Sequence, residues 1–275
     1  MKSSKLAKDH TTEIPQSLTL VLPVLNEIQN IQLLLSELEV LKLKGIHGKI
    51  RIIIVDDGST DGIEDYLARR SVEKIDVTYL GRTDVKSLPL SIWEGIVCAD
   101  STHVIWMDAD GSMPVKVISK LWDKYRDSNV DAVIGSRYVE GGGHKGINVT
   151  GRTSFYDLVK NVNQSEDMLI AVLLSKLLNV FLRFTIRAGI FDMTSGFMLT
   201  RKDLLERSDF DGVYGDYFPN LISKWRKRSL VIEELGYVCL PRQYGKSKTG
   251  TNINQLIKSG IPYLRVGIRE LFQNR

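Results

Sequence analysis

The stretch Trp106-Met107-Asp108-Ala109-Asp110 decides how this sequence is interpreted. It closes an apolar run that starts at His103, and Gly111 and Ser112 follow it directly. Two carboxylates one residue apart, at the end of an apolar strand, need a partner, because apolar surroundings disfavour an unpaired charge. Mg²⁺ or Mn²⁺ is such a partner, since either takes one or two carboxylates and completes its shell with water and phosphate oxygens. The pattern favours a metal site; the structural alternative is an Asp-rich turn in which Asp110 or Ser112 caps the next helix.

Strand-like and helix-like segments alternate five times on both sides of this stretch. Apolar runs predict strands over residues 18–22, 50–55, 77–80, 103–107 and 130–135. Helical spacing predicts helices over 27–43, 88–99 and 115–125, with a short helix after residue 62. This alternation indicates an α/β protein with a doubly wound parallel sheet.

Polar and acidic segments follow three of the predicted strands, at residues 23–27, 56–59 and 108–112. In open sheets of this type, ligands bind beyond the carboxyl ends of the strands. We therefore expect these three segments to converge on one site.

Composition sets wider limits on the class of protein. The 275 residues are 43% hydrophobic and 25% charged, which suits one large α/β domain or two small ones. The net charge of +4 permits an anionic partner without requiring one. Cys98 and Cys239 match no zinc or disulfide pattern, which predicts a reducing compartment. Residues 1–16 lack the apolar core of a secretory signal and are expected to form a flexible tail. No apolar run reaches the ~20 residues needed to span a bilayer.

Two amphipathic segments mark the second half of the chain. Residues 168–190 have helical periodicity, and Lys176, Asn179, Arg183 and Arg187 fall on one face opposite a broad apolar face. This pattern suits a helix lying on anionic lipid and, equally, a core helix with one solvated edge. A second basic amphipathic stretch covers 253–272, where we expect Pro262 to kink or split the helix.

Six segments, taken together and in order, resemble the family-2 glycosyltransferases of GT-A fold. These segments are residues 22–27, 55–61, 108–110, 135–138, 192–197 and 244–248. The last three narrow the resemblance to the branch of dolichol-phosphate mannose synthases and polyprenyl-phosphate glycosyltransferases. The resemblance implies a mostly parallel, Rossmann-like sheet flanked by helices. It implies a flexible tail over 1–16, a GT-A domain over 17–250 and a C-terminal amphipathic helical segment over 251–275.

The same resemblance implies an inverting, metal-dependent transfer of a sugar from a UDP- or GDP-linked donor, with Mg²⁺ or Mn²⁺ as the cofactor. The implied donor-binding residues are Pro23, Leu25, Glu27, Asp56, Asp57 and Asp108. The implied metal residues are Asp108, Asp110 and Ser112, where Ser112 stands at a position that the branch commonly fills with Gln. The candidate catalytic residues are Asp110, Asp192 and Asp216; the last two are candidate general bases for a hydroxyl or amide acceptor.

A phosphate acceptor is already anionic near neutral pH, so it needs cations to hold it more than it needs a base. The candidate cations are Arg137, Arg152, Arg242, Lys246 and Lys248. The leading hypothesis is transfer to a polyprenyl (dolichyl-type) phosphate at the cytoplasmic membrane face, by an enzyme peripheral on that face. The first alternative is a non-lipid acceptor, such as a glycan, a protein or a modified nucleic acid; only the small basic cluster at 224–228 favours nucleic acid. The second alternative is a non-catalytic module that binds a nucleotide-sugar.

Overall fold

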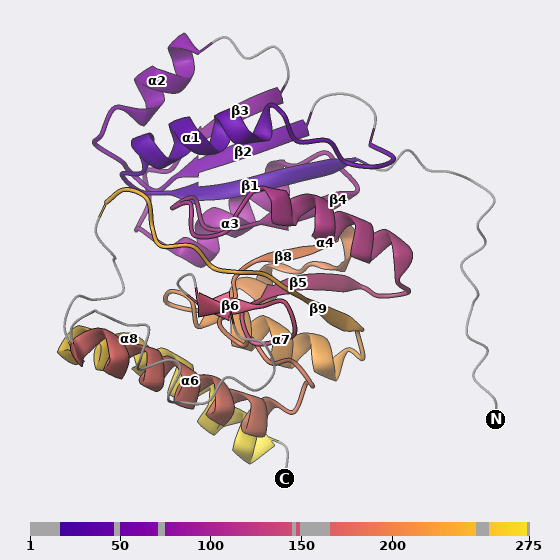
Figure 1. Cartoon of the computed structure of the whole chain (residues 1–275), viewed down its shortest axis with the longest axis vertical. Coiled ribbons are helices and arrows are strands. Elements are labelled where there is room, and N and C mark those ends of the chain that lie inside the picture. Colours follow the sequence, from indigo (N-terminus) through magenta and orange to yellow (C-terminus); the bar gives the residue numbers. More distant parts are fainter. Residues whose placement is uncertain are drawn as a thin grey trace.

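A seven-stranded sheet forms the centre of the molecule, with strand order β3-β2-β1-β4-β8-β5-β9 (Figure 1). The computed structural model describes residues 17–46, 50–70, 75–144, 147–148, 166–245 and 253–273. The strands are β3 (Ile75–Gly81), β2 (Ile50–Asp56), β1 (Leu18–Val24), β4 (His103–Trp106), β8 (Met198–Arg201), β5 (Ala132–Ser136) and β9 (Ile232–Gly236). The predicted tail over 1–16 lies outside the described residues.

The sheet is parallel except at β8, which runs antiparallel to both of its neighbours, β4 and β5. Met198 at the start of β8 faces Trp106 at the end of β4 and also pairs with Ile134 of β5. Strand β8 therefore enters the sheet at the edge where β4 and β5 end, and for this reason it runs antiparallel to both of them. The predicted mostly parallel sheet flanked by helices is confirmed, but the sequence analysis did not predict β8.

Helices cover both faces of the sheet (Figure 1). The helices with three turns or more are α1 (Ile28–Leu38), α3 (Leu88–Cys98), α4 (Lys116–Asp127), α6 (Glu166–Ile186), α7 (Tyr217–Lys227) and α8 (Ile253–Gln273). Shorter elements are α2 (Ile63–Arg69), the 3-10 turns η1 (Lys202–Leu204) and η2 (Arg207–Phe210), and the two-stranded sheet of β6 (Gly143–His144) and β7 (Ile147–Asn148).

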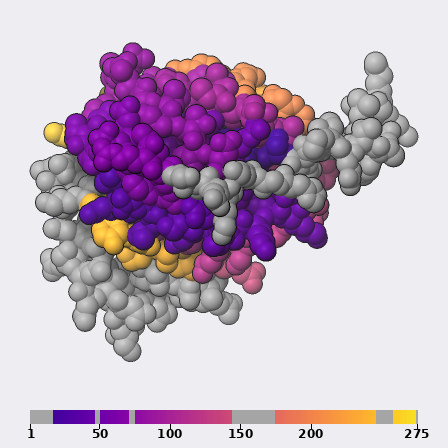
Figure 2. All heavy atoms as spheres, turned by 90° about the horizontal axis from the view of Figure 1, so that it is seen from above, coloured from indigo at the N-terminus to yellow at the C-terminus, as the bar shows by residue number. Residues whose placement is uncertain are grey.

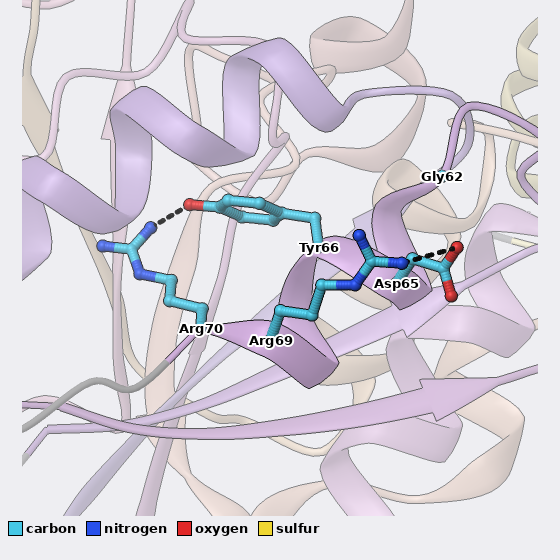
Figure 3. Close-up of a pocket in the computed structure, with 5 residues that line it drawn as sticks. All are labelled: Gly62, Asp65, Tyr66, Arg69 and Arg70. Carbon is cyan, nitrogen blue, oxygen red and sulfur yellow. Dashed lines mark hydrogen bonds and ion pairs between the residues drawn. The ribbon is translucent and has the colours of Figure 1, made fainter.

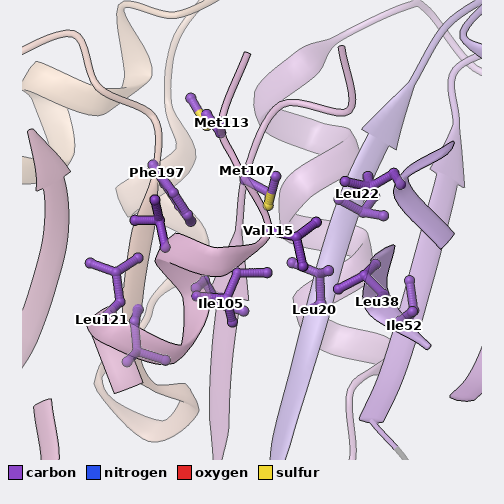
Figure 4. Close-up of a cluster of buried hydrophobic side chains, with 14 of the residues drawn as sticks. Leu20, Leu22, Leu38, Ile52, Ile105, Met107, Met113, Val115, Leu121 and Phe197 are labelled. Carbon is purple, nitrogen blue, oxygen red and sulfur yellow. The ribbon is translucent and has the colours of Figure 1, made fainter. Parts of the chain in front are cut away.

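Alternate side chains of the central strands pack into two separate hydrophobic cores, one on each face of the sheet. Leu20 and Ile52 point to one face, where they join Leu38 of α1 and Leu121 of α4 (Figure 4). The residue next to Leu20, Val21, points to the other face and joins a second core with residues of α3, α6 and α7. A strand covered on both faces must be apolar at every position, which explains the continuous apolar runs in the sequence.

Helix α1 is shorter than the predicted segment 27–43, because it ends at Leu38. Leu43 is still buried in the core, although it lies beyond the helix. Gly45 adopts a φ of +76°, a left-handed conformation that glycine takes at low cost. The apolar periodicity beyond residue 38 reflects burial of the connection to β2 and not a continued helix.

Helices α6 and α8 pack against one another as a layer below the main sheet (Figure 1). At Gly267 of α8, a Cβ atom would lie only 2.4 Å from Cε1 of Phe181, so the absent side chain permits this close approach. Pro262 lies inside α8, which continues through it, so the helix is not split at this proline, and the alternative of a kink stays a prediction. None of the helices within the described ranges combines the length and the hydropathy required to cross a membrane.

The polar residues of α6 do not form the single exposed stripe predicted from the sequence. Asn179 is 3% exposed and faces the protein interior. Arg183 and Arg187 are exposed, and each guanidinium stacks on an aromatic ring, that of Phe191 at 3.8 Å and that of Phe184 at 5.9 Å respectively. Some apolar side chains of α6 are buried in the core and others are exposed to solvent, because only one side of the helix packs on the protein.

Candidate active site

Hydrogen bonds between the loops that follow β1 and β2 join them into one wall. Asn26 adopts a φ of +56°, a left-handed conformation that asparagine tolerates better than most residues. Its side-chain oxygen accepts a hydrogen bond from the backbone amide of Thr60 at 2.7 Å, and its backbone amide donates to Oγ of Ser59 at 2.7 Å. Asp61 accepts from the amide of Ile28 at 2.8 Å, where α1 begins. The predicted donor residues Pro23, Leu25 and Glu27 therefore lie on a segment that is held against residues 56–61.

The two acidic residues at the end of β2 both have protein partners. Asp56 accepts from the amide and hydroxyl of Ser59, at 2.9 and 2.6 Å, and from the Tyr79 hydroxyl at 2.9 Å. Asp57 accepts from the Ser87 amide at 2.6 Å and forms a buried ion pair with Arg82. Arg82 also donates to Glu94 at 3.0 Å, while its buried Nη2 atom has no hydrogen-bond partner among the described residues.

Arg82 is a site residue that the sequence analysis missed. It directly follows Gly81, the last residue of β3, so it lies at the same carboxyl edge as the three predicted segments. The rule that ligands bind at this edge would have identified it.

A guanidinium from the C-terminal half bridges two of the predicted acidic residues. Arg242 lies 2.9 Å from Oε1 of Glu27 and 3.1 Å from Oδ2 of Asp110. Asn30 of α1 donates to the other oxygen of Glu27 at 2.6 Å. The view from above shows the gold segment around residue 240 at the surface next to the indigo N-terminal segment (Figure 2). Burial alone would lower the pKa of Arg242, but Asp110 and Glu27 outweigh it, and the pKa is raised.

Asp108 differs from these acidic residues because no described residue donates a hydrogen bond to its carboxylate, although solvent reaches the side chain. The side chain is exposed to solvent, yet the surrounding protein disfavours its charged form. Burial raises the pKa of Asp108 to about 7, and the charge of Asp110 adds to the rise, while Arg137 and Arg242 oppose it. Asp108 is therefore a carboxylate whose charged form lacks compensation in the protein alone.

The charge of Arg137 also acts on Asp108, and this arginine is held by the turn at residues 192–196. Its Nε and Nη2 donate to the two oxygens of Asp192, at 2.8 and 2.7 Å, and its backbone amide donates to Asp192 at 2.9 Å. Nη2 also reaches the carbonyl and hydroxyl oxygens of Thr194, at 3.0 and 2.8 Å. Asp192 is fully buried, so the pair orients the guanidinium rigidly. A role for Asp192 as a general base stays a prediction.

The remaining predicted residues occupy different positions. Asp216 is buried at the start of α7 and accepts from the amides of Val213 and Tyr214, at 3.0 and 2.7 Å. The Ser112 amide donates to Oδ1 of Asp110 at 3.0 Å, which closes a local turn. The predicted alternative, in which Asp110 or Ser112 caps the next helix, is wrong, because α4 begins at Lys116 with Val115 at its N-cap position and has no side-chain cap. Arg152, Lys246 and Lys248 lie outside the described residues.

The residues around Asp108 fit a divalent cation. No group of three or more His, Cys, Asp or Glu side chains within the described ranges is arranged to hold a metal ion. Two carboxylates are nevertheless sufficient for Mg²⁺, which keeps several water molecules and takes substrate phosphate oxygens as further ligands. Asp108 and Asp110 supply these two carboxylates, and the raised pKa of Asp108 shows that a positive charge at this position would be favourable.

A separate hollow of about 450 Å³ lies on α2, lined by Gly62, Asp65, Tyr66, Arg69 and Arg70 (Figure 3). The cationic side chains of this hollow already have partners. Arg70 contacts the Tyr66 hydroxyl and lies 2.6 Å from Glu39, and Arg69 lies 3.8 Å from Asp65. The hollow is widely open to solvent and contains none of the predicted site residues, so we place the site at Asp108 instead.

Comparison with known proteins identifies a family model and relatives that match this chain. Residues 19–208 match the model of the glycosyl transferase family 2. A polyprenol monophosphomannose synthase from Mycolicibacterium smegmatis is 29% identical over 259 residues, which cover 90% of this chain and 87% of the relative. A dolichol-phosphate mannosyltransferase from Pyrococcus furiosus is 27% identical over 230 residues, which cover 84% of this chain and 58% of that protein.

Solved structures with the same fold include two sugar-phosphoglycerate synthases. Glucosyl-3-phosphoglycerate synthase from Mycobacterium tuberculosis, in complex with Mn²⁺, UDP and phosphoglyceric acid, aligns with a TM-score of 0.61 at 14% identity, covering 93% of this chain and 78% of that chain. Mannosyl-3-phosphoglycerate synthase from Rubrobacter xylanophilus aligns with a TM-score of 0.61 at 16% identity, covering 95% and 76%. At these identities the likeness establishes the GT-A fold.

Proposed function

This chain belongs to glycosyl transferase family 2 and is a glycosyltransferase, and from this premise we propose that it transfers a sugar from a nucleotide-diphosphate donor to a polyprenyl phosphate. The observation that carries the proposal is the Asp108 carboxylate, which has no hydrogen bond from a described residue and is close enough to Asp110, Arg137 and Arg242 for their charges to shift its pKa. The site therefore combines carboxylates that suit a metal-bound diphosphate with a guanidinium that suits a second phosphate.

The donor half of the site consists of the loops after β1, β2 and β4. We assign the nucleoside to the surface formed by residues 23–27 and 56–61, next to the buried ion pair of Asp57 and Arg82. Asp108 and Asp110 would hold Mg²⁺ or Mn²⁺, with Ser112 as a neighbouring hydroxyl. When bound, the cation would stabilise the negative charge that develops on the leaving nucleoside diphosphate.

The acceptor half of the site is assigned to Arg137. In the proposed reaction a phosphate oxygen of the acceptor forms a bond to the anomeric carbon, and the bond from that carbon to the nucleoside diphosphate breaks. An ionised phosphate monoester is already nucleophilic, so the step requires no strong base. Arg137 suits this role because Asp192 and Thr194 engage Nε and Nη2, while Nη1 has no hydrogen bond to a described residue.

The lipid nature of the acceptor is supported by the outer surface of α6 and α8. Exposed apolar side chains follow one strip of each helix: Leu177, Val180 and Phe184 on α6, and Ile261, Leu264, Ile268 and Phe272 on α8. Exposed cations, among them Arg183, Arg187, Lys258 and Arg265, border these strips. Apolar side chains flanked by cations suit the interface of an anionic membrane. We propose that this layer rests on the cytoplasmic face of a membrane as a peripheral contact.

Nucleotide release tests the proposed reaction. Release from GDP-mannose and from a panel of UDP-sugars is measured with Mg²⁺ or Mn²⁺, with and without detergent-solubilised polyprenyl phosphate. We expect the lipid phosphate to stimulate release, EDTA to abolish it and added metal to restore it. The dephosphorylated polyprenol serves as the matched control and is expected to be inactive. Stimulation by phosphoglyceric acid and not by polyprenyl phosphate would support the soluble-acceptor alternative; no release under any condition would support a binding module.

Sedimentation with vesicles tests the membrane contact. Replacing both Phe184 and Phe272 by Ser is expected to lower the partition coefficient onto phosphatidylglycerol vesicles about 30-fold, because each ring is expected to contribute roughly 1 kcal/mol on insertion. Phe184 and Phe272 are 66% and 72% exposed, so the fold is expected to tolerate the change. Val85, which is 84% exposed and lies outside both helices, gives the control variant Val85→Ser. Equal binding of the double variant and this control would contradict the contact.

A further inference from the structure

Asn179 is a buried polar residue on the inward face of α6. It is 3% exposed, and a position of this kind in a helix is usually apolar. Its side-chain oxygen accepts a hydrogen bond from the Met193 amide at 2.8 Å. Its Nδ2 group donates to the Thr194 hydroxyl at 3.1 Å and to the Ser175 carbonyl at 3.0 Å. The carboxamide therefore fastens α6 to the turn at residues 192–196.

The same turn holds Arg137. The Thr194 hydroxyl that accepts from Asn179 also accepts from Nη2 of Arg137 at 2.8 Å. Met193, whose amide Asn179 binds, directly follows Asp192, the charge partner of Arg137. Two hydrogen bonds from one carboxamide therefore fix both residues that orient the guanidinium.

The opposite side of α6 carries Leu177, Val180 and Phe184, which are 57%, 60% and 66% exposed. Asn179 lies between the first two in sequence but points inward. Helix α6 therefore carries the apolar strip assigned to the membrane on one face. Its other face carries the Asn179 carboxamide, which binds the turn at residues 192–196 that holds Arg137.

We propose that Asn179 is a positioning residue that sets the Arg137 guanidinium for the acceptor phosphate and ties it to the lipid-facing helix. The inference rests on the proposed function, in which Arg137 binds that phosphate. A carboxamide meets the local requirement, because the position needs an acceptor for the Met193 amide and a donor for the Thr194 hydroxyl. Leucine offers neither group, and aspartate cannot donate when ionised and would add a second negative charge near Asp192.

The test compares Asn179→Leu, Thr194→Val and Thr194→Ser with Asn220→Leu as a matched control. Asn220 is a 4% exposed residue of α7 that also makes two hydrogen bonds, to the Asp211 carbonyl at 2.8 Å and from Arg269 at 2.6 Å, but it has no contact with the Arg137 turn. For each variant we measure the KM for detergent-solubilised polyprenyl phosphate, the KM for GDP-mannose, and Tm.

Asn179→Leu and Thr194→Val are expected to raise the acceptor KM about tenfold, because a hydrogen bond that orients a charged group is lost. The donor KM is expected to stay within about twofold of wild type, since the donor loops are untouched. Thr194→Ser keeps the hydroxyl and is expected to restore the acceptor KM. Asn220→Leu is expected to lower Tm but to leave the ratio of the acceptor KM to the donor KM as it is in wild type. A lowered Tm with an unchanged acceptor KM in Asn179→Leu would overturn the inference.

Failure of the proposed function is distinguishable, because in that case the wild-type protein itself would not use polyprenyl phosphate. The position of Arg137 is then measured by hydrogen exchange of its backbone amide, which donates to Asp192 at 2.9 Å. Asn179→Leu is expected to accelerate this exchange, whereas Asn220→Leu is not. Equal exchange in the two variants would overturn the positioning role independently of the acceptor.

Discussion

Replacing Asp108 by asparagine is expected to lower metal-dependent turnover about 10³-fold while leaving the fold intact. Asparagine preserves the shape of the side chain but removes the charge that would bind the cation. The physical reason that stability survives is that no described residue donates a hydrogen bond to the Asp108 carboxylate, so no protein contact is lost. Calorimetric titration with Mn²⁺ in the presence of UDP or GDP measures the loss of metal affinity directly.

The pH dependence of stability gives this variant a second signature. Burial and the charge of Asp110 raise the Asp108 pKa to about 7 in the folded protein, whereas an unfolded aspartate titrates near ~3.9. Between these values the folded state binds the proton more strongly, so the stability of the metal-free wild type falls as pH rises from about 4 to about 7. Asp108→Asn removes this loss, and its Tm is expected to equal or exceed that of wild type at pH 8. The two proteins are expected to converge near pH 4.

Asp123→Asn provides the control for both measurements, because Asp123 is an exposed residue of α4, away from the carboxyl edge. It should retain both turnover and metal binding. If Asp108→Asn kept the wild-type metal affinity, the metal site would have to be placed elsewhere and the donor half of the proposal would fail.

Replacing Arg137 by alanine is expected to abolish acceptor use and also to destabilise the fold. The guanidinium neutralises Asp192, which is fully buried. Removing one partner of a buried ion pair leaves an uncompensated charge and costs about 3–5 kcal/mol of the free energy of unfolding. Chemical denaturation measures this loss, and kcat/KM for polyprenyl phosphate is expected to fall by at least about 10²-fold.

A double variant separates stability from activity at this pair. Replacing a buried ion pair by apolar residues of similar size is often neutral for stability. Arg137→Met combined with Asp192→Leu is therefore expected to regain much of the lost stability but none of the acceptor use. Recovery of activity together with stability would show that Arg137 acts only as a structural residue.

The single variant Asp192→Asn tests the predicted general base. If Asp192 only orients Arg137, asparagine should cause partial loss of activity that appears in the acceptor KM. If Asp192 removes a proton from a hydroxyl acceptor, kcat should collapse and the donor and acceptor KM values should change little. The Arg137–Asp192 contacts support the orienting role.

The alternation of strands and helices could be predicted from the sequence because the side-chain periodicity of each element is a local property. Continuous apolar runs predicted β1, β2 and β4, which are covered on both faces. The errors occurred where a long-range contact overrides a local pattern. The apolar residues after Leu38 are buried without being helical, and Pro262 lies within a helix that packs on α6.

Local patterns in the sequence determined the alternating α/β architecture and the positions of Glu27, Asp57, Asp108 and Asp110 after strand ends, and the GT-A fold was implied by the family resemblance of six segments. Only the tertiary structure decided which acidic groups are neutralised: Asp57 by Arg82, Asp192 by Arg137, and Glu27 by Arg242, a residue 215 positions away. It also decided that Asn179 points inward. Charge pairing between residues far apart in the chain depends on how the layers pack, and periodicity along one segment carries no information about that packing.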